Sequence, residues 1–134
     1  MRTETLILEN LIYNDNYSSI VATFLKEEYF KESSEKQIFI EIQNHIIEFS
    51  KAPSVETISV KLNNREDLNE AAYKKCQDVL TTLKEKTEDE EWLTKETEKW
   101  AKDQAVYNGI VQSISILEGK DTKSSKDAIP EILT

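Results

Sequence analysis

Apolar residues recur at intervals of three and four along nearly the whole chain, which is the period of an amphipathic α-helix. A first helix is predicted over residues 3–14, and a second over residues 17–25 with Asn16 as its N-terminal cap. Tyr29 and Phe30 follow this second helix and are expected to fill the core. The opening of the chain therefore predicts helices and no strands.

The next predicted helix covers residues 33–51 and is capped by Ser33 or Ser34. Pro53 ends it, because the residue before a proline avoids the helical region.

Two further helices complete a compact head of about five helices. A short one is capped by Ser54 and stops at residues 63–64, and a longer one runs over residues 67–86. The residues expected to be buried on the last three helices are Ile38, Phe39, Ile42, Ile46, Phe49, Val55, Ile58, Leu62, Leu68, Ala72, Cys76, Val79, Leu80 and Leu83.

The longest predicted helix runs from about residue 89 to residue 118, and Gly119 is its C-terminal stop. Four acids at residues 88–91 favour its start, because they oppose the positive end of the helix dipole. A helix of about thirty residues is about 45 Å long, whereas a head of this size has a radius of about 14 Å. The helix is therefore expected to project beyond the head.

The projecting half of this helix carries apolar residues that need cover. Trp92, Leu93 and Trp100 in the first half can pack on the head, but the later residues lie too far along the helix. A later helix of the same chain could cover them, or a helical hairpin could pair with a second subunit, and both can hold together. Gly109 could allow a close helix approach. The candidate subunit interface consists of Val106, Tyr107, Ile110, Val111, Ile114 and Leu117.

Composition excludes several classes of function. The 134 residues include 17 Lys and Arg against 26 Asp and Glu, a formal net charge of -9, so direct nucleic-acid binding is not expected. The two glycines, Gly109 and Gly119, cannot form a glycine-rich phosphate loop. The single cysteine, Cys76, is expected in the core and fits a reducing cytoplasm. No apolar run is long enough to cross a membrane.

Candidate chemistry is sparse. His45 is the one histidine and shares a helix face with Glu41, but a metal site needs three or four convergent ligands. No nucleophile stands in a recognisable pattern with a base. We therefore expect no catalytic, cofactor-binding or metal-ligating residues in this chain.

Several stretches carry a family resemblance by their order and spacing. They are residues 6–13 (LILENLIY), 28–30 (EYF), 37–42 (QIFIEI), 52–57 (APSVET), 92–100 (WLTKETEKW), 104–108 (QAVYN) and 128–132 (AIPEI). Together they resemble the N-terminal domain of DnaB-type replicative DNA helicases, above all those of T-even-type phages. The likeness spans essentially the whole chain.

This resemblance implies a helical head followed by a helical hairpin, with six copies forming a collar, usually a trimer of dimers. The collar docks primase and sometimes a helicase loader. ATP and Mg²⁺ are expected only in a separate RecA-like motor domain, which is absent from this chain. Residues 1–118 would then be the collar domain, and residues 119–134 a connector and the start of a truncated second hairpin helix. We expect the natural chain to continue past Thr134.

Two functions follow as expectations. The first is a non-catalytic assembly and docking domain of a hexameric replicative helicase in the cytoplasm of a host cell. The second is a free-standing helical adaptor of a phage replication system, which predicts a natural stop near residue 134. An enzyme is a third class, and ATP turnover by the purified chain would reveal it.

Overall fold

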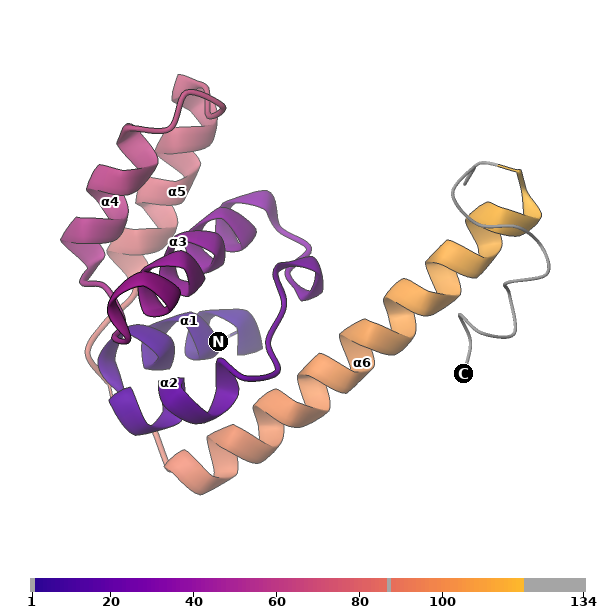
Figure 1. The fold of residues 1–134 in the computed structure, drawn as a ribbon, viewed down its shortest axis with the longest axis horizontal. Coiled ribbons are helices and arrows are strands. Elements are labelled where there is room, and N and C mark those ends of the chain that lie inside the picture. Colours follow the sequence, from indigo (N-terminus) through magenta and orange to yellow (C-terminus); the bar gives the residue numbers. More distant parts are fainter. Residues whose placement is uncertain (1, 87, 120–134) are drawn as a thin grey trace.

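The computed structural model describes residues 2–86 and 88–119, and all regular secondary structure in them is helical. The head, residues 2–86, contains α1 (Thr3–Tyr13), α2 (Asp15–Val21), the 3-10 turn η1 (Glu27–Tyr29), α3 (Ser33–Phe49), α4 (Val55–Asn63) and α5 (Glu70–Thr82). The long helix α6 (Glu90–Leu117) then runs past α2 and η1 and leaves the head as a straight projection (Figure 1). The predicted all-α class is confirmed, including the five helices of the head.

The predicted cap Ser54 and the predicted start of the long helix near residue 89 are both confirmed. Ser54 Oγ accepts a hydrogen bond from the backbone N of Thr57 at 3.1 Å, at the start of α4. Asp89 Oδ1 accepts one from the backbone N of Trp92 at 3.2 Å, at the start of α6. Each bond satisfies a helix N–H that has no partner within the helix. Gly119 has a φ of 73°, the left-handed conformation that stops a helix.

Other predicted helix ends were wrong. Asn14, not Asn16, caps α2, and its Oδ1 accepts from the backbone N of Tyr17 at 3.1 Å. One residue thus separates α1 from α2, because Asn14 ends the first helix and caps the second. The second helix ends at Val21 rather than at Leu25.

The ends of α3 and α5 also differ from the prediction. Neither Ser33 nor Ser34 caps α3, because both already lie within it. Its C-terminal stop is Ser50, whose φ of 61° breaks the helix three residues before the proline. Asn69 caps α5 by accepting from the backbone N of Ala72 at 2.8 Å, so this helix covers Glu70–Thr82 rather than 67–86.

The core of the head lies where α1 and α3 cross and is closed by η1. The rings of Phe30 and Phe39 stack at a centroid distance of 4.8 Å, and Tyr29 is buried beside them, so the predicted aromatic plug is confirmed. Cys76 is buried in the core, as predicted, and burial raises the pKa of its thiol. The prediction was wrong for Phe49, which is 51% exposed. It lies on the last turn of α3, where its ring contacts His45 rather than the core.

Three buried carboxylates, which the periodicity did not reveal, fasten chain segments to the head. Glu9 on α1 accepts from the backbone N of Lys84 at 3.2 Å and so fixes the chain that leaves α5. Glu41 pairs with Arg65 at 3.3 Å, and Glu35 pairs with Arg2 at 3.2 Å. All three carboxylates are buried.

The end of the chain was predicted to hold a connector and the start of a further helix. The predicted connector and the helix start after Gly119 lie outside the described residues. The proposed domain boundary near residue 118 therefore stays a prediction.

Candidate subunit interface on the long helix

The first part of α6 is buried against the head. Leu93 and Thr97 have no exposed surface, and Trp100 is 9% exposed. The ring of Trp100 lies 4.9 Å from that of Phe30 and meets Tyr29 edge-on at 6.3 Å. Leu93 and Trp100 thus pack as predicted.

Trp92 does not pack as predicted, because its side chain is 48% exposed. It lies in the first turn of α6, turned by about 100° around the helix axis from Leu93 and by about 140° from Thr97, the two residues that face the head.

A buried hydrogen bond joins α6 to α2. Tyr17 and Thr97 bring their hydroxyl oxygens to 2.7 Å, and Thr97 Oγ1 also donates to the backbone O of Leu93 at 2.7 Å. Burial raises the pKa of the Tyr17 phenol, and the bond with Thr97 opposes this rise. At the start of the helix, Asn16 Nδ2 donates to Glu90 Oε1.

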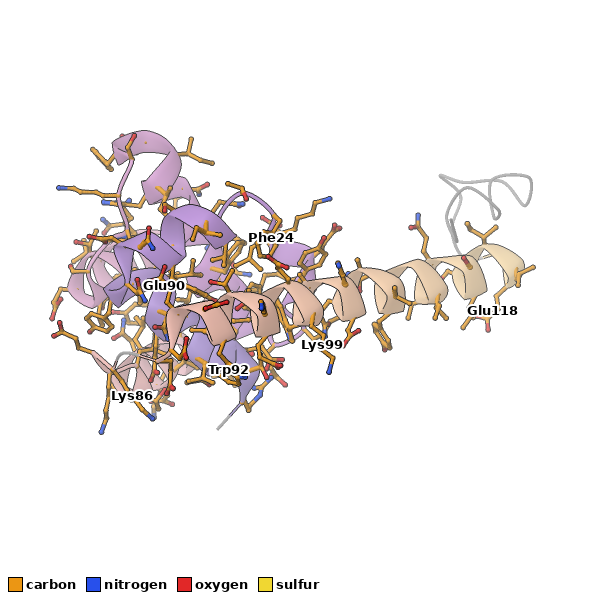
Figure 2. All side chains as sticks on the ribbon, turned by 90° about the horizontal axis from the view of Figure 1, so that it is seen from below. Phe24, Lys86, Glu90, Trp92, Lys99 and Glu118 are labelled. Atoms are coloured by element: carbon orange, nitrogen blue, oxygen red, sulfur yellow. The ribbon has the colours of Figure 1, made fainter. Side chains whose placement is uncertain are left out.

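The arm is the rest of α6, residues 102–117, which follows Ala101, the last residue of this helix in the hydrophobic core of the head. Ser113 and Ile116, farther along the arm, are also buried, but they lie outside that core. Sixteen helical residues extend about 24 Å. Figure 2 shows the helix running from Glu90 and Trp92 beside the head to Glu118, far from it. The predicted projection is confirmed.

An apolar stripe follows the arm and is formed by the six residues of the candidate subunit interface. Each side chain is between 43% and 62% exposed. At about 100° per residue, the six lie within an arc of about 140° around the helix. The stripe comprises Val106, Tyr107, Ile110, Val111, Ile114 and Leu117.

Four stripe residues have the spacing of a helix-pairing seam. Tyr107, Ile110, Ile114 and Leu117 follow each other at intervals of three, four and three, the a and d positions of a heptad. The head does not cover this seam, which points roughly a quarter turn away from the side that Leu93 and Thr97 bury. A continuous apolar face of this kind marks an interaction surface. Its use as a subunit interface stays a prediction.

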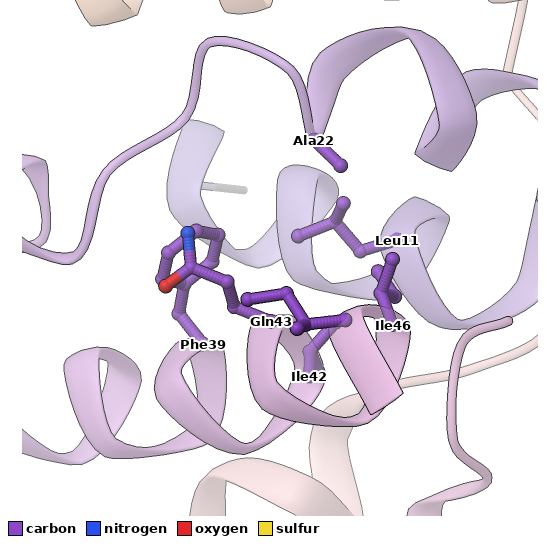
Figure 3. Close-up of a pocket in the computed structure, with 7 residues that line it drawn as sticks. Leu11, Ala22, Phe39, Ile42, Gln43 and Ile46 are labelled. Atoms are coloured by element: carbon purple, nitrogen blue, oxygen red, sulfur yellow. The ribbon is translucent and has the colours of Figure 1, made fainter. Parts of the chain in front are cut away.

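The head carries a second apolar feature, a hollow of about 110 Å³ between α1, α2 and α3. Figure 3 shows Leu11 and Ile42 at this hollow, with Ala22, the residue directly after α2, across from them. Gln43 is the one polar side chain among those that line it, and none is charged. The hollow offers an apolar contact and no acid, base or nucleophile.

His45 takes part in a local contact instead of a metal site. Lys61 Nζ donates to its Nδ1 at 2.8 Å, so the imidazole is neutral with its proton on Nε2. Desolvation, together with Lys61 and Lys51, lowers the pKa of His45. Glu41, on the same helix, pairs with Arg65. Across residues 2–86 and 88–119, no three His, Cys, Asp or Glu side chains gather closely enough to hold a metal ion.

These features define an all-α protein whose long helix presents an unpaired apolar seam. The chain is similar to a protein of Enterobacteria phage T4 named as a DnaB-like replicative helicase, with 30% identity over 96% of this chain. It spans 28% of that protein's length. The match confirms the resemblance to DnaB-type replicative helicases. No family model matches the chain. None of the described helices combines the length and hydropathy needed to cross a bilayer.

Proposed function

We propose that this chain is a non-catalytic assembly and docking domain of a replicative DNA helicase. In this proposal, the arm pairs with other helicase subunits in a hexameric collar, and the head docks primase or a helicase loader. ATP and Mg²⁺ act in a motor domain outside this chain. The similarity to a DnaB-like replicative helicase over 96% of the chain supports the class.

The single observation that carries the proposal is the exposed heptad seam of the arm. Ile110 and Ile114, at its centre, are 47% and 49% exposed. Burying the exposed half of an isoleucine contributes about 1 kcal/mol. Two isoleucines on each of two copies would therefore contribute about 4 kcal/mol to a symmetric pair, roughly a thousandfold in Kd. Aspartates at both positions would also bury unpaired charges, which adds to the loss.

The test compares assembly of the protein encoded by the complete open reading frame with that of its Ile110→Asp/Ile114→Asp variant. Sedimentation velocity should show the parent protein as an oligomer and the variant at least roughly a thousandfold weaker in self-association. The melting of the head should change little, since neither side chain packs on it. A matched control replaces Ile47 and Val60 of the head, which are 75% and 59% exposed, with aspartate and should assemble normally.

Two results would contradict the proposal. The first is normal assembly of the Ile110→Asp/Ile114→Asp variant, which would show that the seam is not the interface. The second is a stop codon directly after codon 134, which would favour the free-standing adaptor. A following strand that ends in G-x-x-x-x-G-K-[ST] would instead identify the expected motor domain.

A further inference from the structure

The arm makes a polar contact with the head beyond Ala101, the last residue of α6 in the hydrophobic core. Asn108 lies two turns after Ala101, and its Nδ2 donates to the backbone O of Glu28 in η1 at 3.1 Å. Its Oδ1 accepts from Nζ of Lys31. Both polar groups of one side chain therefore bind the head.

The Lys31 ammonium, the Asn108 side-chain amide and the Glu28 carbonyl each form hydrogen bonds with the other two. Its Nζ donates to the backbone O of Glu28 at 3.2 Å, the same oxygen that Asn108 binds. The ammonium also lies 5.2 Å from the centroid of the Tyr107 ring, within cation–π range. Desolvation by its neighbours lowers the pKa of Lys31. We call Glu28, Lys31 and Asn108 the latch.

The place of the latch in the fold suits a role in setting the direction of the arm better than a role in stabilising the folded state. Exposed polar contacts contribute little to folding, and asparagine is a poorer helix former than alanine or leucine. The contacts, however, hold the arm at a point beyond the place where it leaves the core of the head, so they can limit its swing. The arm extends about 24 Å beyond Ala101, so a swing of 10° would move its tip by about 4 Å. A displacement of that size would take seam residues out of register with a partner helix.

We propose that Asn108 and Lys31 are positioning residues that set the direction of the arm and thereby aim the apolar stripe at its partner. The expected effect on assembly rests on the proposed function, whereas the effect on the direction of the arm does not. Tyr107 links the latch to the apolar stripe, because it belongs to the stripe and its ring lies beneath the Lys31 ammonium. The latch thus joins the head to the first residue of the heptad seam.

The direction of the arm can be measured in single chains by pulsed electron spin resonance. Spin labels are placed at Lys74→Cys on α5 and Ser115→Cys on the arm, in a Cys76→Ala background. Lys74 is exposed, and Ser115 lies near the tip of the arm. Dilution with unlabelled chain suppresses distances between copies, so the result does not depend on self-association.

Two variants remove the latch and one serves as a control. Asn108→Leu keeps the size of the side chain and improves helix propensity, so the helix itself is retained. Lys31→Met keeps an unbranched apolar side chain but removes the terminal ammonium and its charge. The control is Gln104→Leu, one turn earlier on the arm, since the side chain of Gln104 makes no hydrogen bond to the described residues. Both latch variants should broaden the distance distribution by about 4 Å for each 10° of added swing, and the control should match the parent chain.

Association provides the second readout, in the protein from the complete open reading frame. The latch variants should assemble more weakly than the parent, although the apolar stripe is intact. Distance distributions as narrow as that of the parent would overturn the proposal. Broadened distributions with unchanged assembly would overturn it too, because the direction of the arm would then not matter. If the parent protein itself does not assemble, the proposed function fails, whereas the distances still report on the latch.

Discussion

The hydrogen bond between Tyr17 and Thr97 allows a sharp test of how α6 is held. A threonine hydroxyl has one proton, and Thr97 donates it to the backbone O of Leu93. Tyr17 must therefore be the donor in the 2.7 Å bond between the two hydroxyl groups. Both residues are fully buried, so neither can turn to water.

This assignment predicts unequal effects for the two deletions. Thr97→Val leaves the Tyr17 hydroxyl buried without an acceptor, which costs about 2–3 kcal/mol of unfolding free energy. Tyr17→Phe removes the donor but leaves Thr97 bound to Leu93, so its cost is about 1 kcal/mol. The double variant leaves no buried tyrosine hydroxyl and should cost about 2 kcal/mol, less than the sum of the single variants. The coupling free energy is then about 1–2 kcal/mol.

Urea denaturation of the four proteins, followed by circular dichroism, measures each free energy of unfolding. In thermal melts, each kcal/mol corresponds to about 4 °C for a domain of this size. Thr94→Val, three residues earlier on the same helix, is the matched control and should change the free energy by less than about 0.5 kcal/mol. Additive effects of the two single variants would show that the hydroxyl groups do not interact. Equal costs would contradict the assignment of the donor.

Two further predictions concern the head. Ser50→Gly should raise the free energy of unfolding by about 0.5–1 kcal/mol, because Ser50 has a φ of 61° that glycine adopts without a Cβ clash; an unchanged or lower melting temperature would argue against strain at this residue. Burial raises the pKa of Glu35, against the opposing charge of Arg2, so the folded state holds this proton more tightly than the unfolded state. Stability then falls as pH rises through the folded pKa, and Glu35→Gln should melt above the parent at neutral pH, with the gain disappearing below pH of about 4. A lower melting temperature of Glu35→Gln at neutral pH would show that the pair with Arg2 outweighs burial.

The sequence predicts the helices of this fold well because each one repeats its apolar residues at the helical period. Leu93 and Trp100 were correctly expected on the buried side of α6, and the arm was correctly expected to leave the head. The six stripe residues were also singled out from spacing alone, and the structure shows all of them exposed. Apolar side chains on a part of the helix that projects beyond the core were a sufficient signal to predict an exposed apolar surface.

Residues at helix ends were predicted less well, because the spacing of apolar residues says little about where a helix stops. Phe49 fits the apolar period of α3 but lies on its last turn, past the elements that could cover it. Trp92 fails in the same way in the first turn of α6. Asn14 and Asn16 are two asparagines separated by one residue, so either could cap a helix, and only the tight junction between α1 and α2 selects Asn14.

The latch shows a different limit. Lys31 and Asn108 are 77 residues apart, and neither residue is unusual in its own segment. The one local signal is an asparagine in the middle of a long helix, where it is unfavourable unless its side chain has a use. Affinity along the arm would come from apolar residues that face away from the head, and direction from polar residues that touch it. Apart from Tyr107, which belongs to the stripe and contacts Lys31, separate side chains carry the two properties. Substitutions of Ile110 and Ile114 can therefore weaken the pairing of arms without redirecting them, and substitutions of Asn108 can redirect the arms without altering the apolar seam.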